Sequence, residues 1–144
     1  MTTRAEIVAA ARAQLATPWV HQGRLPGVAL DCLGLVIVVA RQLGFVAPDF
    51  DENGYGRAPD GVRLPEGLAR HLIQIPRAQM APGDVVAMAF DKHPQHVGIV
   101  VPYRHGGLAM IHAASRSGKV EEIRLMFGSH MRFTGAYSFP GGTE

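Results

Sequence analysis

One stretch decides the fold of this chain: Asp31-Cys32-Leu33-Gly34-Leu35-Val36-Ile37-Val38-Val39-Ala40-Arg41-Gln42-Leu43-Gly44. It predicts a helix over 31–43, because Asp31 suits the first turn, Arg41 lies in the last turn and Gly44 is a typical stop. The middle is apolar on every side, as in a buried central helix. The β-branched run would also suit a strand, but its length and end signals favour the helix.

The flanking segments predict a second helix and two loops. Residues 3–15 place apolar side chains on one face at helical spacing, which predicts a short amphipathic helix. Residues 16–30 hold two prolines and two glycines without a sustained period, which predicts a loop. Residues 45–65 are rich in Asp, Gly and Pro, and we expect an ordered loop anchored by Phe50 and Tyr55.

The second half of the chain has strand character. A short helix is predicted over Glu66–Ile75, and a turn at Pro82-Gly83 precedes five short runs rich in Val, Ile and aromatic residues, separated by polar turns. Helices followed by strands predict an α+β domain, with N-terminal helices packed on an antiparallel sheet of about five strands. The expected strands are 84–90, 96–101, 108–113, 120–124 and 134–139.

Length and composition narrow the function classes. The 144 residues suit a single domain over 1–144. Fourteen basic against twelve acidic residues give a net charge of +2 without long charge runs, so we expect neither a nucleic-acid nor a membrane partner. The longest apolar run, 35–40, is too short for a membrane span. We expect a soluble protein made in the cytoplasm without a signal peptide of its own.

Cys32 is the chain's only cysteine, which excludes an intramolecular disulfide framework and a multi-cysteine zinc site. At a helix N-terminus the unpaired amides and the helix dipole stabilise a thiolate, so we expect a lowered pKa and a nucleophilic sulfur. The alternative is a small buried core residue.

Two histidines are candidates for the base that a nucleophilic cysteine requires. His96 opens a predicted strand in which Gly98 leaves room for close packing. His112 lies in the next strand and alternates with apolar neighbours. If residues 104–107 close a hairpin, the two imidazoles lie near one another and His112 can orient His96. The alternative for either is an ordinary structural or surface histidine, of which a chain with seven histidines has several.

Taken in order, these motifs resemble the NlpC family of papain-like cysteine peptidases, over roughly residues 16–113. The matching motifs are Thr17-Pro18-Trp19, Gly23, Asp31-Cys32-Leu33-Gly34, Pro82-Gly83-Asp84-Val85-Val86, His96-Val97-Gly98-Ile99-Val100 and Ile111-His112-Ala113. The resemblance implies a fold of the papain-like NlpC type and cleavage of stem-peptide amide bonds in bacterial peptidoglycan, typically between D-glutamate and diaminopimelate. It implies no metal and no cofactor.

The same resemblance assigns the roles in the site. Cys32 is the nucleophile, His96 the general base and acid, and His112 the residue that orients His96. The stretch Gly23-Arg24-Leu25-Pro26-Gly27 further resembles members carried on phage tails and related gene-transfer particles. Tail-tip proteins would then be partners, and the target cell wall the place of action.

Two positions depart from the family pattern. Trp19 stands where many members have a tyrosine that helps to stabilise the oxyanion. An indole N–H can donate one hydrogen bond, but from a different position than a tyrosine hydroxyl. Leu33 stands where a serine is common, and in relatives that select a free L-alanine amine this serine and the aspartate at Asp31 form the amine pocket. We therefore expect no strict amine selectivity, and we consider His21 as a substitute donor.

Two other functions stay open. One is a structural tail-tip plug or adaptor that keeps the fold with a vestigial triad, which the altered Trp19 and Leu33 favour. The other is a metal site built from Cys32, His93, His96 and His112, because His93 and His96 have ligand-like spacing.

Overall fold

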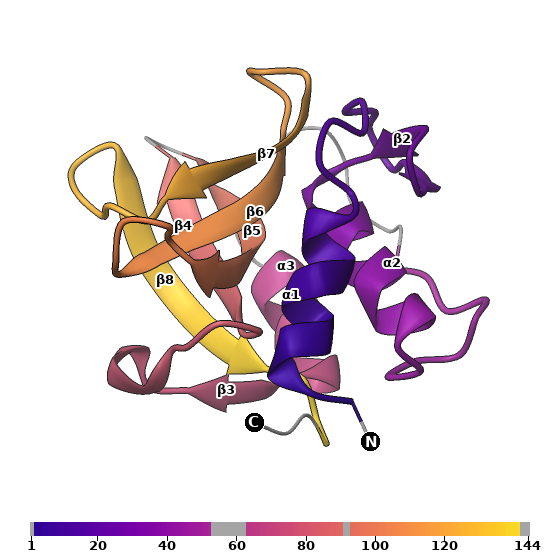
Figure 1. Cartoon of the computed structure of the whole chain (residues 1–144), viewed down its shortest axis with the longest axis horizontal. Helices are drawn as coiled ribbons and strands as arrows, with labels where there is room; N and C mark the ends of the chain where they lie inside the picture. The colour runs from indigo at the N-terminus through magenta and orange to yellow at the C-terminus, as the bar shows by residue number, and fades with distance from the viewer. Residues whose placement is uncertain (1, 53–62, 91–92, 142–144) are drawn as a thin grey trace.

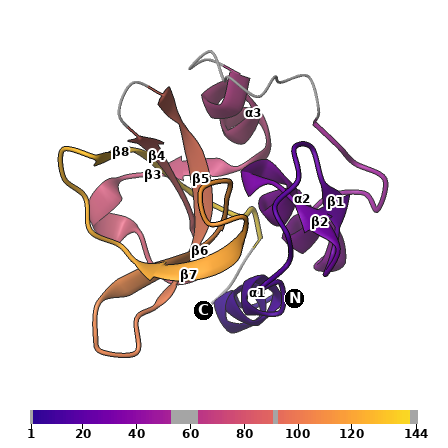
Figure 2. The same cartoon turned by 90° about the horizontal axis from the view of Figure 1, so that it is seen from above.

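The computed structural model describes residues 2–52, 63–90 and 93–141, with only the backbone described at 63–65 and 93–95. Three helices lie to one side of a strongly curved sheet (Figure 1). The view from above shows α1 and α2 side by side against the sheet and α3 apart from them (Figure 2). The expected anchor Tyr55 lies outside the described residues.

The two N-terminal helices begin at side-chain caps. Helix α1 (Arg4–Arg12) follows Thr3, whose hydroxyl accepts a hydrogen bond from the Glu6 N–H, and α2 (Cys32–Gln42) follows Asp31, whose carboxylate accepts from the Gly34 N–H. Such caps satisfy backbone donors that a helix leaves unpaired at its start. Both helices lie where the sequence predicts them, with ends shifted by one to three residues.

The six-stranded sheet has the order β3-β8-β4-β5-β6-β7, and every pair is antiparallel. The four strands β4 to β7 form the expected meander, and β8 returns to pair with β4. Their bounds are β3 (Ile73–Ile75), β4 (Val85–Phe90), β5 (His93–Pro102), β6 (Leu108–Ala114), β7 (Lys119–Arg124) and β8 (Met131–Ser138). The α+β prediction is confirmed, with one strand more than expected.

The additional strand comes from the segment predicted as a helix over 66–75. Helix α3 covers Arg63–His71 and ends there, and Ile73–Ile75 then pairs with β8 before a short 3₁₀ helix, η1 (Arg77–Gln79). Partners more than sixty residues away satisfy the backbone groups of β3, so local helix signals did not reveal this strand.

The predicted loop over 16–30 contains a small hairpin of β1 (Arg24–Leu25) and β2 (Ala29–Leu30). Its end is bound to the segment before it, because the Leu30 N–H donates to the Pro18 carbonyl at 3.0 Å and the Val20 N–H donates to the Leu30 carbonyl at 3.1 Å. These bonds hold the loop beside the start of α2.

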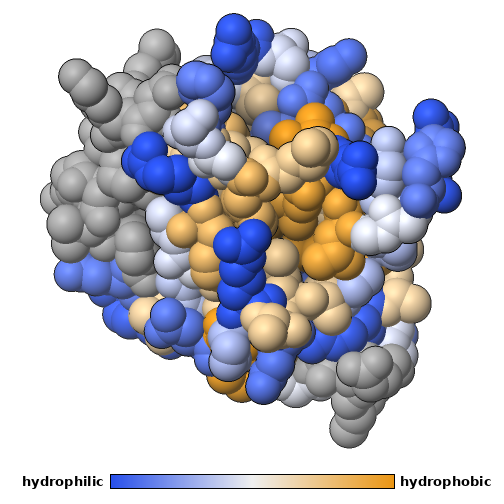
Figure 3. Space-filling view, turned by 90° about the vertical axis from the view of Figure 1, so that its left-hand side faces the viewer, coloured by the Kyte–Doolittle hydropathy of each residue, from blue (hydrophilic) through white to orange (hydrophobic). Residues whose placement is uncertain are grey.

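The curved sheet separates two apolar clusters. The larger cluster packs α1 and α2 against the inner sheet face and includes Leu35, Val39, Val97 and Ile111. The smaller cluster, on the other face, is centred on Val86, Met88, Val100 and Met110. Viewed from the sheet side, the molecule shows apolar side chains gathered in the middle and hydrophilic ones around them (Figure 3).

None of the helices in the described part of the chain is long and apolar enough to cross a membrane.

Candidate active site

Cys32 is the first residue of α2, directly after its cap. The Asp31 Oδ1 atom accepts a hydrogen bond from the Gly34 N–H at 2.7 Å, and the Asp31 carbonyl accepts from the Leu35 N–H at 3.0 Å. Asp31 therefore fixes the first turn of the helix, and with it the direction in which Cys32 leaves the backbone.

The Cys32 thiol lies between two backbone donors. The N–H groups of Leu33 and Val97 both reach the Sγ atom. The last pair of residues matched between β5 and β6 at this end is Ile99 with Ile111, so Val97 lies beyond that pairing. This contact brings the sulfur to the residue that follows His96.

The expected lowering of the Cys32 pKa is wrong. Burial, together with the negative charge of Asp31, raises the pKa of the thiol to about 12, and the two N–H groups and Arg24 offset only part of this effect. Desolvation penalises the charged form of a group, and here it outweighs the helix N-terminus. The resting thiol is therefore protonated and needs a base.

His96 and His112 face each other across the open end of the β5–β6 pair. The His96 Nε2 and His112 Nδ1 atoms are 2.7 Å apart and the two rings are nearly perpendicular. Phe90 packs against His96 at 5.0 Å between ring centroids. The contact uses the Nε2 atom of His96, and it leaves Nδ1 as the nitrogen available to a thiol.

Both imidazoles are neutral near pH 7. Burial, and then the charge of His112, lower the pKa of His96 to about 3. Burial also lowers the pKa of His112, and the Glu121 carboxylate opposes this only in part. A protonated thiol and a neutral imidazole are the protonation states that general-base catalysis requires, in which the proton leaves the sulfur as it attacks.

Glu121 extends this chain of contacts and was not among the candidates from the sequence. It is the cross-strand partner of His112, and its Oε2 atom lies 2.9 Å from the His112 Nε2 atom. In the sequence it is one of two adjacent glutamates in a half-exposed strand, a pattern that reads as surface. Only the register of β6 against β7 reveals it.

Gly98 makes room for His112. A Cβ atom at this position would lie 2.9 Å from the Ile111 carbonyl oxygen, 2.8 Å from the Met110 sulfur and 3.3 Å from the His112 Cβ atom. Close approach of another element is the role expected of a glycine inside a strand.

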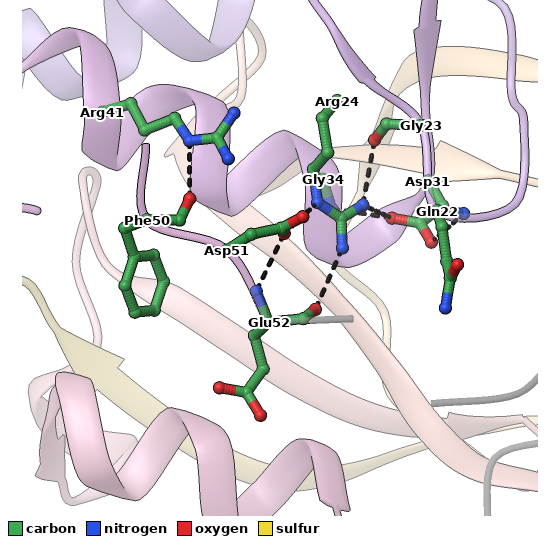
Figure 4. Close-up of polar contacts among 9 residues, drawn as sticks. All are labelled: Gln22, Gly23, Arg24, Asp31, Gly34, Arg41, Phe50, Asp51 and Glu52. Carbon is green, nitrogen blue, oxygen red and sulfur yellow. Dashed lines mark hydrogen bonds and ion pairs between the residues drawn. The ribbon is translucent and has the colours of Figure 1, made fainter. Parts of the chain in front are cut away.

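Asp31 is already paired within the protein. Its Oδ1 atom accepts from the Arg24 Nη1 atom at 2.9 Å and its Oδ2 atom accepts from the Gln22 N–H at 2.8 Å (Figure 4). Asp31 is 3% exposed. The carboxylate expected from the family pattern to meet a substrate amine is thus buried against a guanidinium.

Arg24 also binds the segment that follows α2. Its Nε atom donates to the Asp51 Oδ1 atom at 2.8 Å, and its Nη2 atom donates to the Glu52 carbonyl at 3.1 Å (Figure 4). Partial burial alone would raise the pKa of Asp51. The hydrogen bonds from Arg24 and from the Glu52 N–H, together with the charge of Arg24, outweigh this effect and leave the pKa of Asp51 below its usual range. One guanidinium therefore links the start of α2 to residues 51–52.

Two glycines bring the hairpin loop against α2. A Cβ atom at Gly34 would overlap the Gly23 carbonyl oxygen and lie 2.9 Å from the Arg24 Nη1 atom, and a Cβ at Gly23 would lie 2.6 Å from the Ala29 carbonyl carbon. A larger residue at Gly34 would crowd Arg24 beside Asp31, and one at Gly23 would collide with the backbone of β2.

The remaining candidates surround the start of α2. Trp19 is half-buried, packs against the larger cluster and pairs with Leu30, two residues before Cys32. His21 is half-buried in the adjoining turn, and Leu33 is half-buried beside Cys32. Their contributions to oxyanion or substrate binding stay predictions.

The alternative metal site requires His93, whose side chain lies outside the described residues. In the described part of the chain no group of three or more His, Cys, Asp or Glu side chains is arranged to hold a metal ion.

Comparison with known proteins matches the model of the NlpC/P60 family over residues 16–134. No curated protein matches. Among solved structures, NlpC2 from Trichomonas vaginalis superposes with a TM-score of 0.70 at 19% identity. The superposition covers 96% of this chain and 47% of the NlpC2 chain. The NlpC/p60 domain of the peptidoglycan hydrolase SagA gives 0.63 at 26% identity, over 95% of this chain and 99% of that domain.

A P60 domain of an antigen from M. avium subspecies paratuberculosis gives a TM-score of 0.57 at 20% identity, over 94% of this chain and 92% of that one. This chain thus spans about half the length of the Trichomonas protein and nearly all of each isolated domain. The family match covers most of the chain, including Cys32, His96 and His112. This chain belongs to the NlpC/P60 family, whose members are typically cysteine peptidases that act on peptidoglycan.

Proposed function

We propose that this protein is a cysteine endopeptidase that cleaves stem-peptide amide bonds of bacterial peptidoglycan. The observation that supports the proposal is that the Cys32 sulfur meets the backbone N–H of Val97, the residue after His96, and that His96 itself contacts His112 at 2.7 Å. Family membership supplies the substrate class.

The reaction follows from these protonation states. His96 takes the thiol proton at Nδ1 while Cys32 Sγ attacks the peptide carbonyl, and the resulting imidazolium keeps its contact with His112. His96 then protonates the leaving amine as the acyl-enzyme forms. The neutral imidazole next activates a water molecule, which releases the acid and restores the thiol.

We further propose that the scissile bond joins D-glutamate to diaminopimelate, and that the protein is carried on a phage or phage-like tail and acts at the target cell wall. The resemblance of residues 23–27 to tail-borne members supports the second part. Purified tail particles should contain this chain when analysed by mass spectrometry, and particles that lack it would contradict that placement.

Purified muropeptides test the chemistry. Cys32→Ala should abolish cleavage, by at least about a thousandfold in kcat/KM. Its melting temperature should stay close to that of the wild type, because only one sulfur atom is removed. His112→Ala should keep residual activity, since an orienting group assists proton transfer without performing it. Mass analysis of the products identifies the bond, and full activity in Cys32→Ala would refute the mechanism.

The second candidate is a structural tail-tip adaptor with a vestigial site. The protonated thiol of the half-buried Cys32 and the occupied Asp31 favour it. It predicts no turnover of any muropeptide by the wild type, together with normal incorporation of Cys32→Ala into particles. If the wild type turns over a muropeptide and Cys32→Ala does not, the adaptor function is refuted.

A further inference from the structure

Glu121 is held at the far end of the contact chain that starts at His96. The pairing of β6 with β7 sets it opposite His112, with 2.9 Å between Oε2 and the His112 Nε2 atom. The His112 side chain is 4% exposed and that of Glu121 is 28% exposed. The carboxylate is thus partly solvated, while the imidazole it contacts is enclosed.

The protons along the contacts from Glu121 through His112 to His96 have only one consistent arrangement. A carboxylate accepts hydrogen bonds and does not donate them, so the His112 Nε2 atom carries a proton. A neutral imidazole has one N–H and one acceptor nitrogen, so the His112 Nδ1 atom is the acceptor. The His96 Nε2 atom, 2.7 Å away, must then be the donor.

We propose that Glu121 is a positioning residue that sets the tautomers of both histidines and so leaves the His96 Nδ1 atom unprotonated, ready to accept a proton. The inference rests on the proposed function for its catalytic consequence, but its proton arrangement is measurable without any substrate. The His112 imidazole transmits the effect of the Glu121 carboxylate to the His96 imidazole.

Without the carboxylate the opposite arrangement becomes available. The His112 Nε2 atom can then act as an acceptor, Nδ1 becomes the donor, and the proton on His96 moves to its Nδ1 atom. That atom would be a donor and could not remove a proton from Cys32. A wrong tautomer of an otherwise well-placed histidine costs orders of magnitude in rate.

The first test is the proton arrangement of the wild type. Protein labelled with ¹⁵N in its histidine rings is examined by long-range proton–nitrogen NMR correlation at pH 7, with ring signals assigned from His96→Gln and His112→Gln. Protons on Nε2 of both histidines are expected. A proton on the Nδ1 atom of His96 in the wild type overturns the proposal before any glutamate is changed.

The second test compares Glu121→Leu and Glu121→Ala with a matched control. The control is Glu122→Leu, the adjacent glutamate, whose Oε1 atom contacts the Arg12 Nε atom at 3.2 Å instead of a histidine. Both Glu121 variants should transfer part or all of the His96 proton to Nδ1 and lower kcat about tenfold to a thousandfold with little change in KM. The Glu122→Leu control should change neither the position of the His96 proton nor kcat.

Unchanged ring tautomers in both folded Glu121 variants refute the positioning role, whatever the activity. If the wild type cleaves no muropeptide, the proposed function fails while the tautomer measurement still decides the role of Glu121. The amide spectrum of each variant verifies that it is folded, and two variants of different size guard against a packing defect in one of them.

Discussion

Arg24 forms a buried ion pair with Asp31, with 2.9 Å between Nη1 and Oδ1 and side chains that are 10% and 5% exposed. Asp31 caps the helix that carries Cys32, so this pair lies directly beside the sulfur. A guanidinium already neutralises the carboxylate that the family resemblance assigns to a substrate amine. The pair therefore bears on selectivity as well as on stability.

We predict weak selection for a free N-terminal alanine. Specificity constants on a free tetrapeptide and on its disaccharide-linked counterpart should differ by less than about a hundredfold, or roughly 2.7 kcal/mol. Arg24→Leu should raise the preference for the free peptide, because it exposes Asp31 to a substrate ammonium. Arg41→Gln is the matched control, since Arg41 donates to the Phe50 carbonyl at 2.7 Å and so holds the same segment. A wild-type preference beyond a hundredfold would contradict this prediction.

Alkylation of Cys32 should be slow at neutral pH and should accelerate as the pH rises. With the thiol pKa near 12, the thiolate fraction grows about tenfold per pH unit well beyond pH 9. Iodoacetamide kinetics between pH 7 and 10 measure this. The same chain in denaturant is the control, because its rate should level off near the ordinary cysteine pKa. A rate that levels off below pH 9 in the folded protein would show a thiolate stabilised at neutral pH.

Acid should destabilise the protein through His96. Its pKa falls from 6.5 to about 3 on folding, so between these values the unfolded state binds the extra proton and stability decreases as the pH drops. The contribution is at most roughly 5 kcal/mol. Urea unfolding at pH 7, 5.5 and 4 should show a steeper loss in the wild type than in His96→Gln. Equal slopes in the two proteins would refute a His96 that stays neutral in the folded state.

Gly98→Ala should damage both stability and the histidine pair. The added methyl would lie 2.9 Å from the Ile111 carbonyl oxygen, which is backbone and cannot easily move. We expect a loss of about 1–3 kcal/mol in the free energy of unfolding, and altered His112 ring signals. Gly128→Ala is the control, because no atom lies within 4 Å of its added Cβ. Equal stabilities of the two variants would show that β5 and β6 tolerate the methyl group.

Local sequence signals predicted much of the framework. Asp31 and Gly44 frame α2 because a cap and a stop act within a few residues, and Val- and Ile-rich runs between polar turns mark the meander of β4 to β7. The alternation around His112 correctly indicated its burial, at 3% exposed. These features depend on neighbours in the chain, so the sequence by itself determined them.

Tertiary structure decided what depends on distant partners. Ile73–Ile75 is a strand because β8 pairs with it, Glu121 meets His112 through strand register, and Arg24 meets both Asp31 and Asp51 through folding of the loops around α2. Burial likewise reversed the expected direction of the Cys32 pKa shift. Desolvation and cross-strand contact are properties of the packed molecule, and no local pattern encodes them.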